Sequence, residues 1–228
     1  MGGCFFEVVE TLGVSLTDKQ KRQFETYFEV LLEWNERMNL TSLTTKEDVY
    51  MKHFLDSLHM ISLIDLKDQL VLDVGSGAGF PGMPLKIAFP DLKLTIVDAL
   101  KKRIVFLETL CEKLGLKVEL MHGRIEEHGL KNHYDIVTAR AVAPLRILSE
   151  LCLPFIAVGG CFIAYKSTRT ACELQASENA LKKLGGKLDT VLSYEVASHE
   201  RTLIKVVKTA RGSEKYPRPL HKIKKDPL

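Results

Sequence analysis

The sequence of 228 residues contains no long hydrophobic run. No stretch approaches the roughly 18 consecutive apolar residues that a membrane-spanning helix requires. Glu7 and Glu10 interrupt the N-terminal segment before the apolar core of a secretion signal could form. We therefore expect a protein that neither crosses a membrane nor is secreted.

Cysteine is scarce and irregularly spaced. The five cysteines are Cys4, Cys111, Cys152, Cys161 and Cys172, an odd number without any C-x-x-C pair. This spacing argues against a disulfide framework and against a zinc site. It indicates a protein of the reducing cytoplasm without a bound metal.

Charge of either sign shows no large excess, since 32 lysines and arginines stand against 29 aspartates and glutamates. The net charge of +3 is too small to demonstrate a polyanionic partner. The contents of hydrophobic residues, 46%, and charged residues, 27%, are those of a folded globular chain. Basic residues are concentrated in residues 211–228, which we interpret as a tail that is either solvated or contacts nucleic-acid phosphates.

Residues 1–66 are predicted to form an N-terminal helical cap. Thr17 precedes Gln20 by three positions, the spacing of a capping box, and apolar residues then recur at helical intervals. A second capping pattern, at Thr44 and Glu47, precedes another helix.

Residues 67–210 alternate short apolar runs with helical patterns, which is typical of βαβ units around a parallel sheet. Strands are predicted at 69–74, 93–97, 117–120, 134–139, 160–165, 187–193 and 202–208, and helices at 81–89, 100–114, 144–157 and 170–184. Only a short loop separates the last two strands, so the sheet should end in an antiparallel hairpin. The predicted fold class is α/β, with a Rossmann-like, seven-stranded, mostly parallel sheet whose last strand is antiparallel.

The first strand runs into three alternating glycines, Gly75, Gly77 and Gly79. Glycine allows a sharp turn and a close approach of ligand to main chain, and Pro81 then starts a helix with free N–H groups. Asp98 ends the second strand, where its carboxylate can accept hydrogen bonds from ribose hydroxyls. Loop and carboxylate together indicate an adenosine-type cofactor; the alternatives are a ligand-free turn and a solvated carboxylate.

Residues that the loop lacks narrow the choice of cofactor. Phe80 stands where a dinucleotide-binding loop requires a third glycine, and no Walker A lysine follows. S-adenosylmethionine has no phosphate, and its carboxylate and ribose match the loop and Asp98. We therefore predict S-adenosylmethionine as the cofactor.

Five segments carry a family resemblance: 39–41 (NLT), 53–58 (HFLDSL), 73–82 (DVGSGAGFPG), 138–145 (TARAVAPL) and 215–218 (KYPR). Together they resemble the ribosomal RNA small subunit methyltransferase G family of class I bacterial methyltransferases, from about Trp34 to the C-terminus. The resemblance implies methylation of N7 of a specific guanine in 16S ribosomal RNA. The implied partner is that RNA or the small ribosomal subunit, with no membrane and no metal, and we expect a monomer.

The resemblance also implies functional residues. Gly75 and Phe80 would contact the cofactor, Ile125 and Glu126 would hold its adenine, and Arg140 would lie at the cofactor and the target base. Asp98 matches the acidic residue of the second strand. Lys166, Arg218 and Lys222 are candidate RNA-binding residues, although a solvated role is open for Lys166.

Arg140 is the candidate catalytic residue, and two roles are open for it. An arginine can hold the cofactor carboxylate, the role that we favour, or read O6 of a guanine. Because N7 of neutral guanine carries an in-plane lone pair, no general base is required. His53 and Asp56, three apart on one helix, are interpreted as packing residues, and Asn39 as a turn residue.

Two other classes of function are open. A non-catalytic, cofactor-sensing RNA-binding regulator would retain the glycine loop without transferring a methyl group. A methyltransferase for small molecules would not require the basic tail.

Overall fold

The core of the protein is one mixed sheet of seven strands in the order β3-β2-β1-β4-β5-β7-β6. The computed structural model describes residues 5–140, 143–167 and 170–228. The strands are β1 (Leu70–Val74), β2 (Lys93–Asp98), β3 (Glu119–His122), β4 (Tyr134–Arg140), β5 (Ile156–Lys166), β6 (Gly186–Val196) and β7 (His199–Lys208). β7 lies antiparallel between β5 and β6, which confirms the predicted antiparallel end of the sheet.

The parallel register brings three strand ends to one edge of the sheet. β1 pairs with β2 on one side and with β4 on the other, and Val74 lies beside Val97. The residues that follow β1 and the last residues of β2 and β4 therefore gather at the same edge. This edge is where an open α/β sheet binds its ligands.

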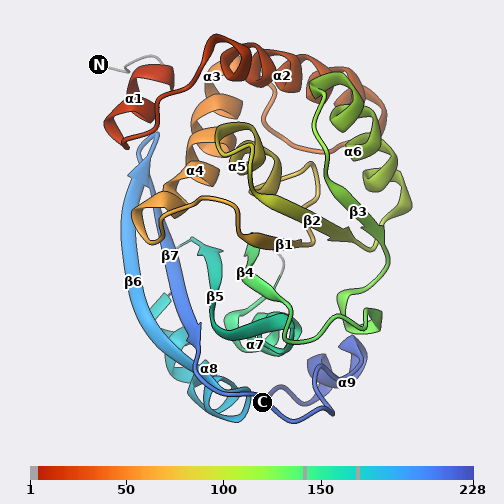
Figure 1. Cartoon of the computed structure of the whole chain (residues 1–228), viewed down its shortest axis with the longest axis vertical. Coiled ribbons are helices and arrows are strands. Elements are labelled where there is room, and N and C mark those ends of the chain that lie inside the picture. The colour runs from red at the N-terminus through yellow and green to blue at the C-terminus, as the bar shows by residue number, and fades with distance from the viewer. Residues whose placement is uncertain (1–4, 141–142, 168–169) are drawn as a thin grey trace.

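Helices cover both faces of the sheet (Figure 1). On one face lie α1 (Phe5–Thr11), α2 (Asp18–Met38), α3 (Lys46–Val49), α4 (Asp56–Leu58), α5 (Gly82–Ala88) and α6 (Lys101–Leu114), and on the other α7 (Leu145–Cys152), α8 (Thr170–Lys183) and α9 (Leu220–Lys225). Successive strand residues alternate between the two cores, as Val71 does with Leu72. None of the described helices is long and apolar enough to span a bilayer.

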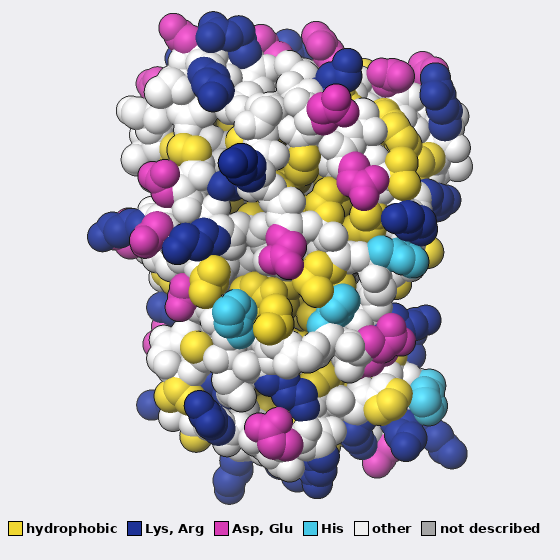
Figure 2. Space-filling model, turned by 45° about the vertical axis from the view of Figure 1, so that its right-hand side comes forward, with side chains coloured by type: hydrophobic (Ala, Val, Ile, Leu, Met, Phe, Trp, Pro, Cys, Tyr) yellow, Lys and Arg dark blue, Asp and Glu magenta, His cyan; other side chains and the backbone are white. Residues whose placement is uncertain are grey.

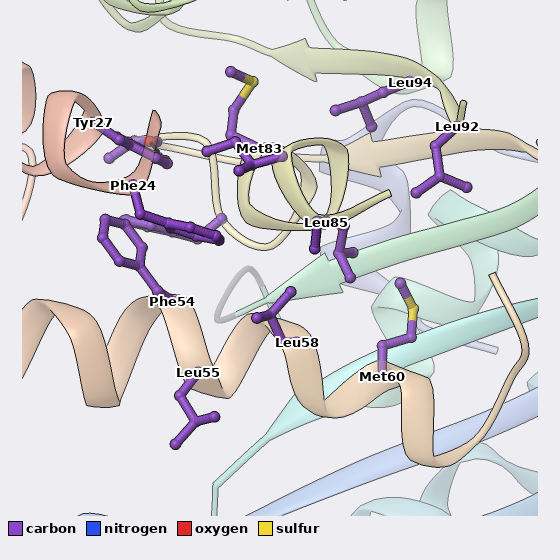
Figure 3. Close-up of a cluster of buried hydrophobic side chains, with 14 of the residues drawn as sticks. Phe24, Tyr27, Phe54, Leu55, Leu58, Met60, Met83, Leu85, Leu92 and Leu94 are labelled. Carbon is purple, nitrogen blue, oxygen red and sulfur yellow. Dashed lines mark hydrogen bonds between the residues drawn. The ribbon is translucent and has the colours of Figure 1, made fainter. Parts of the chain in front are cut away.

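The N-terminal helices share the first of these cores. Thr17 and Gln20 form the predicted capping box at the start of α2, and Asn39 ends the helix with φ +48°, as a turn residue. Phe24 and Tyr27 of α2 pack on Phe54, and Figure 3 shows these rings beside the apolar residues of α5. The cap is thus held by aromatic packing on the same face as α5 and α6.

A single helical rod follows α2 and contains an irregular turn. α3 passes into a π-helical segment, η1 (Tyr50–Leu55), then into α4 and a 3-10 turn, η2 (His59–Ser62). Its N-cap is Thr45, which accepts a hydrogen bond from the Asp48 amide, so the predicted cap at Thr44 is wrong by one residue. π-Helical turns often occur at functional sites, and this one carries His53.

The largest differences from the predicted boundaries lie between α7 and β5. The helix predicted over 144–157 ends at Cys152, a 3-10 turn with Pro154 follows (η4, Leu153–Phe155), and β5 begins at Ile156. Proline cannot continue the hydrogen-bond ladder of a helix, and Ile156 pairs with Tyr134. A further 3-10 turn, η3 (Ile125–Glu127), follows β3. Cys4 and the motif residues 141–142 lie outside the described residues.

Candidate functional site

The glycine loop turns the chain sharply between β1 and α5. Gly75, Gly77 and Gly79 have φ values of +70°, +63° and +97°, which are conformations that favour glycine. The Gly75 amide donates to the carbonyl of Val97 over 2.8 Å, so the loop is tied to the end of β2. The loop therefore lies directly over the carboxyl edge of the sheet.

The glycines of this loop face different surroundings. A Cβ at Gly77 would have only the Arg103 guanidinium within reach, at 4.0 Å. A Cβ at Gly79 would lie 2.7 Å from both the Tyr27 hydroxyl and a Met83 carbon. Gly77 thus opens onto the cavity described below, whereas Gly79 permits close packing of the loop on α2 and α5.

Asp98 connects the loop to the second strand. Its carboxylate accepts hydrogen bonds from the Gly77 amide (3.0 Å), the Leu100 amide (2.9 Å) and the Arg103 guanidinium (3.1 Å), and its side chain is 2% exposed. A carboxylate offers about four acceptor positions, so these bonds leave about one. Binding two ribose hydroxyls would require Arg103, whose side chain is 37% exposed, to move aside.

A cavity of about 430 Å³ opens between the loop and the N-terminal helices. It is lined by Leu40, Thr41, His53, Gly75, Ser76, Gly77, Ala78, Phe80, Asp98, Ala99, Leu100, Arg103 and Arg140. Ser76 Oγ is buried, and the Ser76 side chain interacts with the carboxyl of Asp73. The open main chain at Gly77, the Ser76 hydroxyl and the Asp98 carboxylate fit the carboxylate, amine and ribose of S-adenosylmethionine.

The inner wall of this cavity is a stack of rings and a guanidinium. Phe80 lies between Tyr27, at a ring-centroid distance of 5.5 Å, and His53, at 4.5 Å. The Arg140 guanidinium lies 4.8 Å from the centre of the Phe80 ring. Cation–π contact and stacking hold Arg140 and His53 side by side.

His53 is held in one neutral tautomer. Its Nδ1 lies 3.1 Å from Arg140 Nη2 and its Nε2 lies 2.8 Å from Thr41 Oγ1. Because a guanidinium only donates, Nδ1 must accept, and Nε2 therefore carries the proton and donates to Thr41. Burial, and then the positive charge of Arg140, lower the pKa of His53 to about 3.

Asp56 holds the other side of Arg140. Its Oδ2 accepts from Arg140 Nη1 over 2.9 Å, and its Oδ1 accepts from the Tyr194 hydroxyl over 2.7 Å. Burial raises the pKa of Tyr194 well above its usual value, so the phenol keeps its proton. Arg140 is thus fixed from two directions, by Asp56 and by His53.

A second carboxyl group, Asp73, is buried beneath the loop. Its Oδ2 accepts from the Gly82 amide over 2.8 Å, and its carboxyl also interacts with the Ser76 hydroxyl. Burial raises the pKa of Asp73 to about 7. The group supports the start of α5 and does not line the cavity.

The expected adenine-binding residues lie away from this cavity. Ile125 is buried in the second core, and Glu126 accepts a hydrogen bond from the Leu220 amide of α9 over 3.1 Å. Both follow β3, whose last residue pairs with Asp98. Ile125 and Glu126 therefore lie near the end of β2, where an adenine could reach them, but they do not line the cavity.

The candidate RNA-binding residues differ in availability. Arg218 binds the buried carboxylate of Glu150 with two side-chain hydrogen bonds of 2.7 Å, so it anchors the tail to α7. Lys166 pairs with Glu173 at 2.6 Å and donates to the Ala143 carbonyl. Lys222 is exposed on α9. Figure 2 shows basic side chains at the lower end of the molecule, where Figure 1 places α9.

Residue chemistry alone missed the partners of Arg140. His53 and Asp56 were expected only to pack. Tyr194 and Arg201, which contact Asp56, carried no signal in the sequence. The two residues of the HFLDSL segment contact Arg140 across 87 and 84 positions of sequence. The resemblance of that segment to the family was the one available indication.

Comparison with known proteins agrees with this geometry. The family model described as rRNA small subunit methyltransferase G matches residues 20–204. A ribosomal RNA small subunit methyltransferase G from Staphylococcus saprophyticus is 49% identical, covering 96% of this chain and 95% of that protein. One from Bacillus cytotoxicus is 50% identical, covering 90% of each.

Solved structures share the fold. An S-adenosylmethionine-dependent methyltransferase from Aquifex aeolicus has a TM-score of 0.56 and 18% identity, covering 74% of this chain and 97% of its own. The YcgJ protein from Bacillus subtilis also has a TM-score of 0.56, with 14% identity, covering 69% of this chain and all of its own. The predicted class I methyltransferase fold is thereby confirmed.

Proposed function

Because this chain belongs to the ribosomal RNA small subunit methyltransferase G family, we propose that it transfers the methyl group of S-adenosylmethionine to N7 of a guanine in 16S ribosomal RNA. One observation carries the proposal: Arg140, fixed by His53 and Asp56, lies at the wall of the cavity beside the glycine loop. Its partner is 16S ribosomal RNA, free or within the small subunit, and the protein acts as a monomer.

The cavity residues would divide the cofactor between them. The main chain of Gly75 and Gly77 and the Ser76 hydroxyl would bind its polar end, and Asp98 would bind its ribose. When bound, S-adenosylmethionine supplies an electrophilic methyl group on a positively charged sulfur. Phe80 and Arg140 would then form the wall nearest to that methyl group.

The reaction calls for positioning more than for proton transfer. N7 of guanine attacks with its own lone pair, so no residue has to remove a proton first. Alignment of two bound reactants can contribute roughly 7–11 kcal/mol to lowering the barrier. Arg140 suits this role because its two hydrogen-bonded neighbours prevent it from swinging away.

Labelled methyl transfer tests the proposal directly. Purified protein should transfer the methyl group to 16S ribosomal RNA or to the small subunit, at a single guanine N7 mapped by base-specific cleavage. Cofactor binding without transfer to either substrate would contradict the proposal and favour a cofactor-sensing regulator.

A matched pair of glycine variants tests where the cofactor lies. Gly77 and Gly115 share a φ of +63°, and neither is crowded, but only Gly77 lines the cavity. Gly77→Val should abolish cofactor binding in calorimetry because its side chain enters the cavity, whereas Gly115→Val should bind normally once folded. Equal affinity in the two variants would place the cofactor elsewhere.

A further inference from the structure

A second cavity, of about 350 Å³, adjoins the first. It is lined by Lys52, His53, Asp56, Arg140, Tyr165, Lys166, Ser167, Glu173 and Arg201. His53 and Arg140 line both cavities, so the two spaces meet at this pair. A base in the second cavity would therefore lie next to a cofactor in the first, as direct methyl transfer requires.

The rim of the second cavity is basic. Lys52 and Arg201 have side chains that are 22% and 27% exposed. Lys52 pairs with Asp48 at 2.7 Å, whereas Arg201 donates through Nη1 to the Glu200 carbonyl over 3.2 Å and its Nε lies 3.8 Å from Asp56 Oδ1. Such side chains can contact the phosphates on either side of a nucleotide that leaves the RNA stack.

Two carboxylates line this cavity, and they differ in free acceptor positions. Asp56 receives Arg140 on one oxygen and Tyr194 on the other, with Arg201 nearby. In contrast, the two contacts to Glu173 from the described residues, by the Leu145 amide at 2.9 Å and by Lys166 Nζ at 2.6 Å, both fall on Oε2. Among the described residues, Oε1 of Glu173 therefore receives no hydrogen bond, and the Glu173 side chain is 29% exposed.

We propose that the second cavity receives the target guanosine and that Glu173 recognises the hydrogen-bond donors of its base. This inference rests on the proposed function. Guanine presents N1–H and an N2 amino group on the edge of the ring system opposite N7, so a base whose N7 faces the cofactor in the first cavity turns these donors away from it. Both donors can share Oε1 of Glu173, the oxygen that receives no hydrogen bond from the described residues.

The same contact explains discrimination between bases. Adenine presents an acceptor at N1, which a carboxylate repels, and therefore binds poorly beside Glu173. Lys166 is then a positioning residue, since it pairs with Oε2 of Glu173. In this proposal Lys166 orients Glu173 and does not itself contact the RNA.

Substitution of inosine for the target guanosine tests the contact, because inosine lacks only the N2 amino group. In wild-type protein, kcat/KM for methyl transfer should fall about 10-fold or more on RNA ligated with inosine at the target. In Glu173→Gln, this guanosine-to-inosine ratio should shrink to about threefold or less. The ratio compares two substrates with one enzyme, so it does not depend on the folded fraction.

Glu178→Gln provides the control, since Glu178 is exposed on the same helix. It should keep the wild-type ratio, and both variants should bind S-adenosylhomocysteine with wild-type affinity. A ratio equally large in wild type and Glu173→Gln would overturn the inference. Absence of methyl transfer by the wild type to guanosine RNA would instead reject the proposed function, so the two failures are distinguishable.

Discussion

At the scale of single residues, the site depends on side chains whose hydrogen bonds leave little freedom. Asp98 binds two amides and a guanidinium, and Arg140 is held by Asp56 and His53. A change of one oxygen or one proton at these positions alters several contacts together. Two predictions follow from this coupling.

Asp98→Asn should weaken cofactor binding by about 1.5–3 kcal/mol, because hydrogen bonds to a charged group are lost. The amide also turns an N–H donor toward Gly77 or Arg103, which themselves only donate. Titration calorimetry with S-adenosylhomocysteine measures the affinity. Asp91→Asn, on an exposed turn, is the control, and equal affinities in the two variants would argue against a role for Asp98 in the cofactor site.

His53→Gln should change how stability depends on pH. Folded His53 has its pKa lowered from 6.5 to about 3, so the unfolded chain binds a proton that the folded chain does not as pH falls through this range. Wild-type stability therefore contains a component that is present above pH 6.5 and is lost toward pH 3. Glutamine can accept from Arg140 and donate to Thr41 without titrating.

Denaturant unfolding at a series of pH values measures how the free energy of unfolding of each protein depends on pH. Relative to wild type, His53→Gln should gain about 1.4 kcal/mol per pH unit as pH falls from 6 to 4. Asp73, whose pKa is raised to about 7, has the opposite dependence, losing its contribution as pH rises from about 4 to 7. That component occurs in both proteins and cancels in the difference. Parallel curves would mean that His53 titrates normally.

At the scale of elements, the glycine loop is shaped by the helices packed on it as well as by the ligand it would hold. Tyr27 of α2 donates to the Ala78 carbonyl over 2.5 Å and stacks on Phe80. The N-terminal helices thus form part of the site wall.

Gly79→Ala should therefore lower stability more than Gly77→Ala, by about 1–3 kcal/mol. Both have positive φ, but only at Gly79 would the new Cβ lie 2.7 Å from Tyr27 and Met83. Denaturant midpoints at constant m-value measure the difference. Equal destabilisation of the two variants would show that the side chains of Tyr27 and Met83 move aside at little cost.

At the scale of the whole molecule, the basic tail packs against the rest of the protein. Some of its basic side chains are paired with buried groups, and others are exposed. Arg218 pairs with fully buried Glu150, and Ile223 of α9 is buried in the second core. Lys222 is exposed. Positive charge in the tail therefore serves folding at Arg218 and is exposed to solvent at Lys222.

Arg218→Ala should lower the free energy of unfolding by about 3 kcal/mol, because Glu150 is left buried without its partner. Lys222→Ala should leave stability within about 0.5 kcal/mol but reduce the salt dependence of RNA binding by about one charge. Chemical denaturation and binding at several salt concentrations measure the two effects. A stable Arg218→Ala variant would mean that water reaches Glu150.

Local sequence patterns were enough to predict the sheet, its antiparallel end, the capping box at Thr17 and the glycine loop. These features depend on local periodicity and on conformations that particular residue types allow. The end of α7 and the cap at Thr45 deviated by a few residues, because pairing with a neighbouring strand and local side-chain hydrogen bonds decide such boundaries. The loop and the strand-end carboxylate predicted a ligand site at this edge of the sheet, and both line the cavity of about 430 Å³.

The neighbours of Arg140, and the partners of Arg218 and Lys166, became visible only in the folded chain. The Arg140–Asp56 and Arg218–Glu150 pairs join residues 84 and 68 positions apart, and no periodicity relates such positions. The sequence shows that a residue is charged. Burial decides whether that charge pairs with another residue of the protein or is exposed to a ligand. For this reason the family segments predicted which residues belong to the candidate site, while the fold shows which residues lie next to each of them.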